Sequence, residues 1–165
     1  MRILGLDPGL AKSGFGFINY VNGGSSEILY GDISTSKDEV ISQRLWKIYS
    51  EVKEIVQKTN PDAVVIEDIF FCKNVKTAIS VAQSRGVMIL ASAQLNCPVF
   101  EYTPLQIKQS VVGYGHATKM QVQQMVKTLL NLKEIPKPDH AADALAAALC
   151  HAHSLKFSKL LANKK

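Results

Sequence analysis

Two short apolar runs that end in carboxylates constrain this chain most strongly. The first run covers residues 2–7 and ends at Asp7, and the second covers residues 63–67 and ends at Glu67. Nearly continuous apolar runs of this length are typical of central strands in a sheet. A carboxylate at the end of a buried strand is costly unless a cation meets it there. A hard divalent metal ion is the simplest such cation.

The other elements predict an α/β fold with a mixed five-stranded sheet. The turn residues at positions 22–24 indicate an antiparallel hairpin between strands at residues 14–20 and 27–35. Residues 98–102 form the fifth strand. Helices are expected at residues 38–58, 75–95, 104–112, 118–130 and 138–155. This order predicts helices on both faces of the sheet.

A third group of candidate metal ligands lies at the start of the last predicted helix. His140 and Asp143 are three residues apart just after Pro138, so they share one face of the first helical turn. A histidine alone is more often a surface or capping residue than a ligand. Together with Asp143 and the two distant carboxylates it becomes a credible imidazole ligand. The sequence therefore predicts a metal site built from Asp7, Glu67, His140 and Asp143.

The residues beside the two strand ends bear on the same site. Gly14 and Gly16 lie on the strand next to Asp7, where the missing side chains would let a phosphate or metal approach the backbone; a plain turn is the alternative. Asp68 follows Glu67 and would point to the other face of the sheet. Phe70 follows in a Phe-Phe pair, of which one ring is expected to be exposed and able to stack on a base.

Residues 113–119 form a loop that runs into a helix start. Thr118 and Gln121 predict a capping box there. The exposed amides of this start, with Lys119 and Lys108, would bind an anion. An ordinary capped helix with solvated lysines is equally consistent with these residues.

The composition is that of a globular protein of one domain. The 165 residues include 47% hydrophobic and 20% charged residues, and the net charge is +5. A basic body around an acidic pocket suits an enzyme that cleaves a polyanion, but the charge excess is too modest to establish nucleic acid as the partner. We expect residues 1–155 to be one domain and residues 156–165 a basic tail, whose order the sequence leaves open.

The cysteines and the apolar runs bear on the cellular location of the protein. Its three cysteines are scattered and form no CxxC pair, so they are expected to be reduced thiols in a cytoplasmic protein. No run reaches the roughly 18 apolar residues that a membrane span requires. We expect neither export nor membrane insertion. His151 and His153 are interpreted as surface residues near the tail.

The helix at residues 75–95 is apolar on more than one face. One face can cover the sheet, and the second needs another partner. A matching subunit is the simplest partner, which predicts a homodimer. A helix buried within the single chain is the alternative.

In combination, these residues resemble the RuvC-type Holliday-junction resolvases, dimeric nucleases with an RNase H-like fold. The likeness covers nearly the whole chain. Its ordered matches are Gly5-Leu6-Asp7-Pro8-Gly9, Glu67 followed by Phe70, Asn74, Arg85-Gly86-Val87, Tyr102-Thr103-Pro104, Lys108, Val112-Gly113-Tyr114-Gly115 with Ala117 and Lys119, and Ala141-Ala142-Asp143-Ala144-Leu145-Ala146.

The resemblance implies that Asp7, Glu67 and Asp143 are the catalytic carboxylates. His140 falls where many members have a fourth carboxylate and some have histidine, so activity is expected to survive. Histidine removes one negative charge and adds a softer ligand, which favours Mn²⁺. Two Mg²⁺ or Mn²⁺ ions, roughly 4 Å apart, would be held by the four side chains.

The resemblance also implies partners. Lys108 and Lys119 match lysines that bind DNA, and Phe70 matches an aromatic residue at the opened centre of the junction. The expected function is resolution of four-way DNA junctions by paired symmetric nicks, in recombination and repair. A branch-migration motor is an expected partner.

Two other functions stay open. One is a YqgF-like nuclease that acts on ribosomal RNA precursors, against which the helix at residues 75–95 and the loop at residues 113–119 argue. The other is a junction-binding protein without catalysis, if His140 has broken the site. Binding without cleavage in either Mg²⁺ or Mn²⁺ would indicate the latter.

Overall fold

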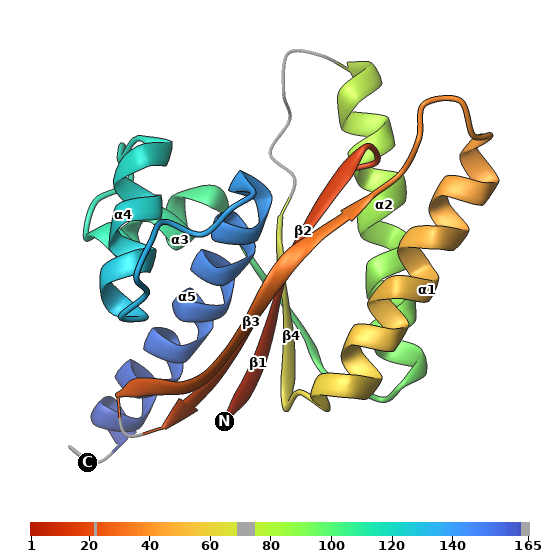
Figure 1. Ribbon diagram of the computed structural model, residues 1–165. Helices are drawn as coiled ribbons and strands as arrows, with labels where there is room; N and C mark the ends of the chain where they lie inside the picture. The colour runs from red at the N-terminus through yellow and green to blue at the C-terminus, as the bar shows by residue number, and fades with distance from the viewer. Residues whose placement is uncertain (22, 69–74, 163–165) are drawn as a thin grey trace.

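In the computed structural model, five strands form one mixed sheet between two layers of helices (Figure 1). The structure describes residues 1–21, 23–68 and 75–162. The strands are β1 (Arg2–Asp7), β2 (Lys12–Val21), β3 (Gly24–Ser34), β4 (Ala63–Glu67) and β5 (Val99–Tyr102), in the order β3-β2-β1-β4-β5. Strand β2 is antiparallel to β1 and β3, whereas β4 is parallel to β1 and β5. The predicted five-stranded mixed sheet is confirmed.

Helices cover both faces, as predicted (Figure 1). Helices α1 (Ile41–Thr59) and α2 (Val75–Gln94) lie on one face. On the other face α5 (Asp139–Ala162) contacts all five strands, and α3 (Pro104–Val112) and α4 (Lys119–Leu129) pack against α5. Helix α5 runs to Ala162, beyond the end expected near residue 155.

The spacing of apolar residues explains how α1 packs. Its buried residues Ile48, Val52 and Val56 recur every four positions and form one core with α2 and the sheet. The helix ends at Asn60, which has a φ of 41° and donates its backbone N–H to the oxygen of Val56. Asparagine is one of the few residues that tolerate this left-handed conformation, so the sequence fixes the end of α1 locally.

Alternate residues of β1 and β4 enter two separate cores. Leu4 packs with residues of α1 and α2, whereas Ile3 and Val65 pack with residues of α5. Because side chains alternate along a strand, Gly5 and Asp7 follow Ile3 on the α5 face of β1, and Glu67 follows Val65 on the α5 face of β4. The two carboxylates therefore lie on the same face, at the ends of neighbouring strands.

Glycines seat α5 directly on the backbone of the sheet. A Cβ atom added at Gly5 would lie 1.9 Å from a backbone oxygen of α5, and one at Gly14 would lie 1.9 Å from the backbone oxygen of His140. At Gly16 the added atom would be 2.6 Å from a backbone nitrogen of α5. The prediction that Gly14 and Gly16 leave room for a phosphate or metal is therefore wrong, because the helix occupies that space. The close approach brings the first turn of α5 to the end of β1.

Neither of the two histidines expected at the surface is exposed. His151 is 2% exposed, and its Nδ1 lies 2.9 Å from the hydroxyl oxygen of Tyr102 on β5. The ring of Phe100 packs beside it, with centroids 4.3 Å apart. His153 is half-buried, with its Nδ1 3.3 Å from Oγ of Ser110 on α3. The surface interpretation is wrong because α3 and β5 cover this part of α5, and burial lowers the pKa of His151.

Two of the cysteines, Cys97 and Cys150, are buried free thiols. Cys72 lies outside the described residues. Among the described helices, none combines the length and the apolar character that crossing a membrane requires.

Candidate active site

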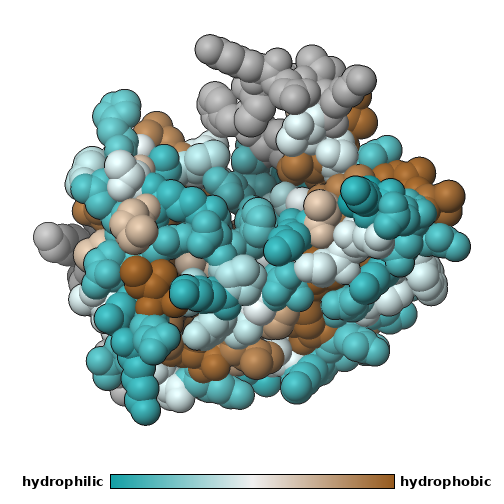
Figure 2. Space-filling model, turned by 45° about the horizontal axis from the view of Figure 1, so that its top comes forward, coloured by the Kyte–Doolittle hydropathy of each residue, from teal (hydrophilic) through white to brown (hydrophobic). Residues whose placement is uncertain are grey.

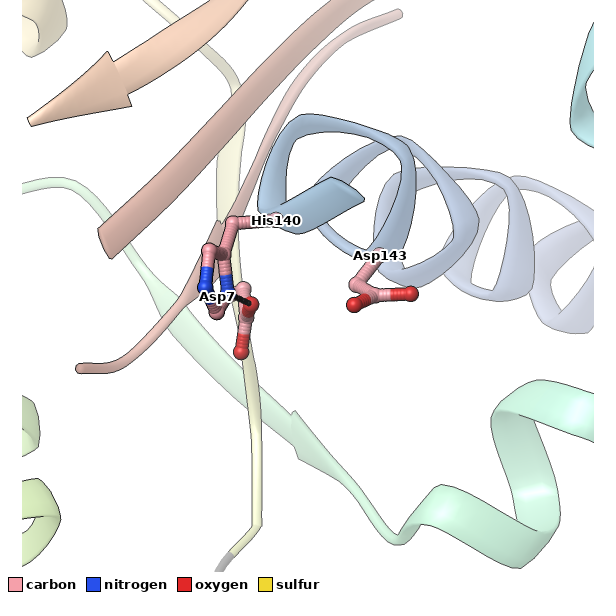
Figure 3. A group of neighbouring side chains, drawn as sticks. All are labelled: Asp7, His140 and Asp143. Carbon is pink, nitrogen blue, oxygen red and sulfur yellow. Dashed lines mark hydrogen bonds and ion pairs between the residues drawn. The ribbon is translucent and has the colours of Figure 1, made fainter. Parts of the chain in front are cut away.

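Three of the four predicted ligands meet where β1 ends and α5 begins. One donor atom from each of Asp7, His140 and Asp143 lies within 4.8 Å of the other two. His140 and Asp143 project from the first turn of α5 on the side where Asp7 lies, and a hydrogen bond joins His140 to Asp7 (Figure 3). Carboxylate oxygens and an imidazole nitrogen at this spacing fit a divalent metal ion.

Glu67, the fourth predicted ligand, is the last residue of β4. It lines a cavity of about 270 Å³ together with Asp143, Lys108 and Lys119. Burial is the largest cause that raises the pKa of Glu67 from 4.5 to about 7; the charges of Asp7 and Asp143 raise it further, and the two lysines oppose them. A bound cation would favour the ionised carboxylate, so the donor set at this strand end suits a metal.

Asp143 shares the site with a lysine from α4. Its Oδ2 lies 3.0 Å from Nζ of Lys119, which is also 3.6 Å from Oδ2 of Asp139. Burial raises the pKa of Asp143, and the hydrogen bond from Lys119 opposes that rise. Burial lowers the pKa of Lys119, but the hydrogen bond and charge of Asp143 outweigh it and raise the pKa overall. Lys119 is thus a cation held within the acidic cluster.

His140 is tied to Asp7 more directly than the sequence indicated. Its Nδ1 donates a hydrogen bond to Oδ2 of Asp7 at 2.7 Å. This hydrogen bond raises the pKa of His140, although burial opposes the rise. Because an imidazole binds metal in its neutral form, metal binding by His140 is expected to release a proton.

Of the predicted DNA-binding residues, Lys108 and Lys119 lie in the part of the chain that the structure describes. Lys108, on α3, lines the same cavity as Lys119 at the start of α4. The capping box of Thr118 and Gln121 is confirmed, since each side chain accepts a hydrogen bond from the backbone of the other. Phe70 lies outside the described residues. Mainly hydrophilic residues occupy the middle of the surface at this end of the sheet (Figure 2).

Tyr102 has a role that sequence reasoning missed. It is the residue opposite Glu67 in the β4–β5 ladder, and its hydroxyl bonds to His151 of α5. The hydrogen bond therefore links the strand beside Glu67 to the helix that carries Asp143. The two partners are 49 residues apart in the chain, so no local pattern reveals the pair.

A sheet with RNase H-like topology, carboxylates at two strand ends, and a histidine and lysines beside them define a metal-dependent nuclease. The family model of crossover junction endodeoxyribonuclease RuvC matches residues 3–151, and the chain belongs to this family.

Similar proteins cover almost the whole chain. The chain is 56% identical to the crossover junction endodeoxyribonuclease RuvC of Clostridioides difficile, over 99% of the chain and 96% of that relative. It is 54% identical to the RuvC of Alkaliphilus oremlandii, over 97% and 98%. A structure of T. thermophilus RuvC in complex with Holliday junction substrate superposes with a TM-score of 0.90, at 35% identity and 96% coverage of both chains.

Proposed function

We propose that this protein resolves four-way DNA junctions by metal-dependent hydrolysis at Asp7, Glu67, His140 and Asp143. The observation that carries the proposal is the convergence of donor atoms from Asp7, His140 and Asp143 within 4.8 Å, beside the cavity that Glu67 lines. Family membership supplies the substrate class, since the relatives are crossover junction endodeoxyribonucleases.

Each residue has a task in the proposed reaction. Asp7, Glu67 and Asp143 offer carboxylate oxygens and His140 an imidazole nitrogen to two Mg²⁺ ions, with Mn²⁺ as an alternative. Bound metal ions lower the pKa of an attacking water and stabilise the charge on the leaving 3′ oxygen. The chain itself must place the phosphate.

Lys108 and Lys119 are proposed to hold that phosphate. They line one cavity with Glu67 and Asp143, so a phosphate bound by both lysines lies beside the ligand set. Hydrolysis would leave 5′-phosphate and 3′-hydroxyl ends that a ligase can seal. Phosphodiester cleavage needs neutralised charge more than a strong base, which is consistent with a site rich in carboxylates and lysines.

We propose that two copies of the chain pair through α2. Ile79 and Leu90 on this helix are 56% and 59% exposed. Ala82 and Gly86 are exposed between them at helical spacing, so the four residues form one apolar stripe. A twofold dimer presents two sites, and resolution of a junction requires two symmetric cuts.

Other parts of the proposal rest on the resemblance alone. Phe70 is proposed to stack at the centre of the opened junction. A branch-migration motor is proposed as a partner, and the cytoplasm as the place of action. Residues 1–155 are proposed to form the nuclease domain, with residues 156–165 as a basic tail.

The test is cleavage of a labelled four-way junction beside a linear duplex of the same sequence, in Mg²⁺, Mn²⁺ or EDTA. We expect paired symmetric nicks on the junction alone, lost in EDTA and reduced at least about a hundredfold by Asp7→Asn. Asp62→Asn is the matched control: Asp62 lies at the other end of the sheet, where it pairs with Arg2, and its loss should leave cleavage unchanged.

Two other outcomes would replace the proposal. Tight junction binding without nicks in either metal would indicate a binding protein. Neither binding nor cutting would direct the search to structured RNA. His140→Asp tests ligation by the histidine, because a true ligand should change the preference between Mg²⁺ and Mn²⁺.

A further inference from the structure

Arg85 of α2 forms two ion pairs with the strand ends that border the active site. Its Nη2 lies 2.7 Å from Oε2 of Glu101 on β5 and 3.5 Å from Oδ1 of Asp68, the residue that follows Glu67. The Arg85 side chain is 19% exposed, whereas those of Asp68 and Glu101 are 44% and 46% exposed, so solvent reaches these pairs mainly from the side of the acids. A planar guanidinium held by two acids fixes their relative positions.

These ion pairs act from the face opposite the metal ligands. The backbone N–H of Asp68 donates to the oxygen of Tyr102 at 2.9 Å, so the β4–β5 pairing continues one residue past Glu67. In this extended segment adjacent side chains point to opposite faces. Glu67 accordingly faces the cavity with Asp143, while Asp68 faces Arg85.

We propose that Arg85 is a positioning residue that holds the end of β4, and with it the Glu67 carboxylate, in place for the metal. The inference rests on the proposed role of Glu67 as a ligand. Glu67 is the last residue of β4, and it is bonded directly to Asp68, the residue with which Arg85 forms an ion pair. Freedom at this point would move the carboxylate relative to Asp7 and Asp143.

Metal binding is sensitive to displacements of this kind. Metal–ligand distances are defined to about 0.2 Å, and loss of a residue that orients a ligand typically weakens metal affinity by about ten- to a hundredfold. Tyr102 holds the same strand end from the α5 side through His151. Arg85 is its counterpart on the α2 side, so the Glu67 position is supported from both faces of the sheet.

The experiment measures Mn²⁺ binding to the DNA-free protein by calorimetry. For Arg85→Gln we expect the dissociation constant to rise about ten- to a hundredfold. Junction binding in EDTA should be unchanged, and cleavage should recover at high Mn²⁺. Arg85→Lys keeps the charge but replaces the guanidinium, whose Nη2 contacts both acids, by a single ammonium on a flexible stem, so an intermediate rise is expected.

Arg2→Gln is the matched control. It removes another arginine–aspartate ion pair, between Arg2 and Asp62 at 3.8 Å, at the opposite end of the sheet. Its Mn²⁺ affinity should equal that of the wild type. A change of the same size in both variants would mean that any lost surface charge weakens metal binding, and would overturn the positioning role.

Unchanged Mn²⁺ affinity in a folded Arg85→Gln protein would also overturn the inference. If that variant does not fold, Asp68→Asn removes the charge that Arg85 contacts at the end of β4, keeps Arg85, and is read by the same titration. Glu67→Gln distinguishes a failure of the ligand set from a failure of the positioning role. If its Mn²⁺ binding equals that of the wild type, the proposed ligand set is wrong, whatever Arg85 does.

Discussion

Helices α2 and α5 are both apolar around much of their circumference, yet they have different surroundings. Helix α5 lies between the sheet on one side and α3 and α4 on the other, and every residue from Ala144 to Cys150 is buried. Helix α2 packs on α1 and the sheet but exposes Ile79 and Leu90. A helix that is apolar on several faces needs cover on each of them. The chain covers α5 from Ala144 to Cys150 on all sides, whereas α1 and the sheet leave one apolar face of α2 exposed.

The contacts beneath the two helices also differ. Helix α5 rests on the glycine backbone of β1 and β2, so its position is set by close approach of main chains. Helix α2 packs through side chains such as Met88 and through the ion pairs of Arg85. The helix that carries His140 and Asp143 thus has less room to move than α2.

The largest expected effect comes from filling the space under α5. Gly5→Ala would place a Cβ atom 1.9 Å from a backbone oxygen of α5. We expect it to lower the free energy of unfolding by more than about 4 kcal/mol, measured by urea denaturation. Gly24→Ala is the control, because a Cβ atom there meets nothing within 4 Å. A stable, active Gly5→Ala protein would contradict the direct seating of α5.

A matched pair of truncations tests the comparison itself. Leu145 of α5 is 0% exposed and Leu90 of α2 is 59% exposed. Leu145→Ala should lower the free energy of unfolding by about 3 kcal/mol. Leu90→Ala should change the free energy of unfolding of the monomer by less than about 0.5 kcal/mol. It should, however, weaken dimerisation about tenfold, as measured by sedimentation. If Leu90→Ala leaves self-association intact, α2 is not the dimer face.

The charged residues beneath α5 predict a pH effect. The pKa of Glu67 rises on folding from 4.5 to about 7, so the ionised carboxylate destabilises the folded protein. This penalty is absent below pH 4.5, grows from pH 4.5 to 7 and is constant above pH 7. Glu67→Gln should therefore raise the free energy of unfolding by about 2 kcal/mol at pH 8 in EDTA, and by much less at pH 5.

The control for that effect is Glu27→Gln, which changes an exposed carboxylate on β3 and should leave the free energy of unfolding at pH 8 nearly unchanged. Saturating metal should reverse the advantage of Glu67→Gln, because metal stabilises only the protein that retains its ligand. If the wild type and Glu67→Gln have equal free energies of unfolding at pH 8 in EDTA, the ionised Glu67 carboxylate does not destabilise the folded protein.

The smallest effect is expected at Gly86, within the exposed stripe of α2. A Cβ atom added there meets nothing within 4 Å in the monomer. Because alanine favours the helix over glycine, Gly86→Ala should stabilise the monomer by up to about 1 kcal/mol, measured by thermal denaturation at low concentration. In the dimer the added methyl group should weaken association. Stronger association would argue that no helix packs closely at Gly86.

Local patterns in the sequence predicted much of the site. Alternation in β4 placed Glu67 and Asp68 on opposite faces, and the spacing of His140 and Asp143 placed both on one side of α5. Each of these inferences depends only on the geometry of one element.

Contacts between distant elements were not predictable in the same way. Gly14 was interpreted as leaving room for a ligand because the sequence around it does not indicate that α5 packs there. The contact is with His140, which is far away in the chain. His151 was placed at the surface because its cover, Tyr102 and Phe100, comes from β5. Arg85 likewise joins residues 17 and 16 positions away on two strands, a pairing that only the folded sheet creates.

The proposed reaction requires that Asp7, Glu67, His140 and Asp143 form one metal centre. Anomalous X-ray diffraction from crystals soaked in Mn²⁺ tests it most directly, because the ions are then located independently of activity. We expect two Mn²⁺ peaks per chain, bounded by these four side chains, and their loss in Asp7→Asn. Peaks elsewhere, or a His140 ring that stays on Asp7 without touching metal, would contradict it.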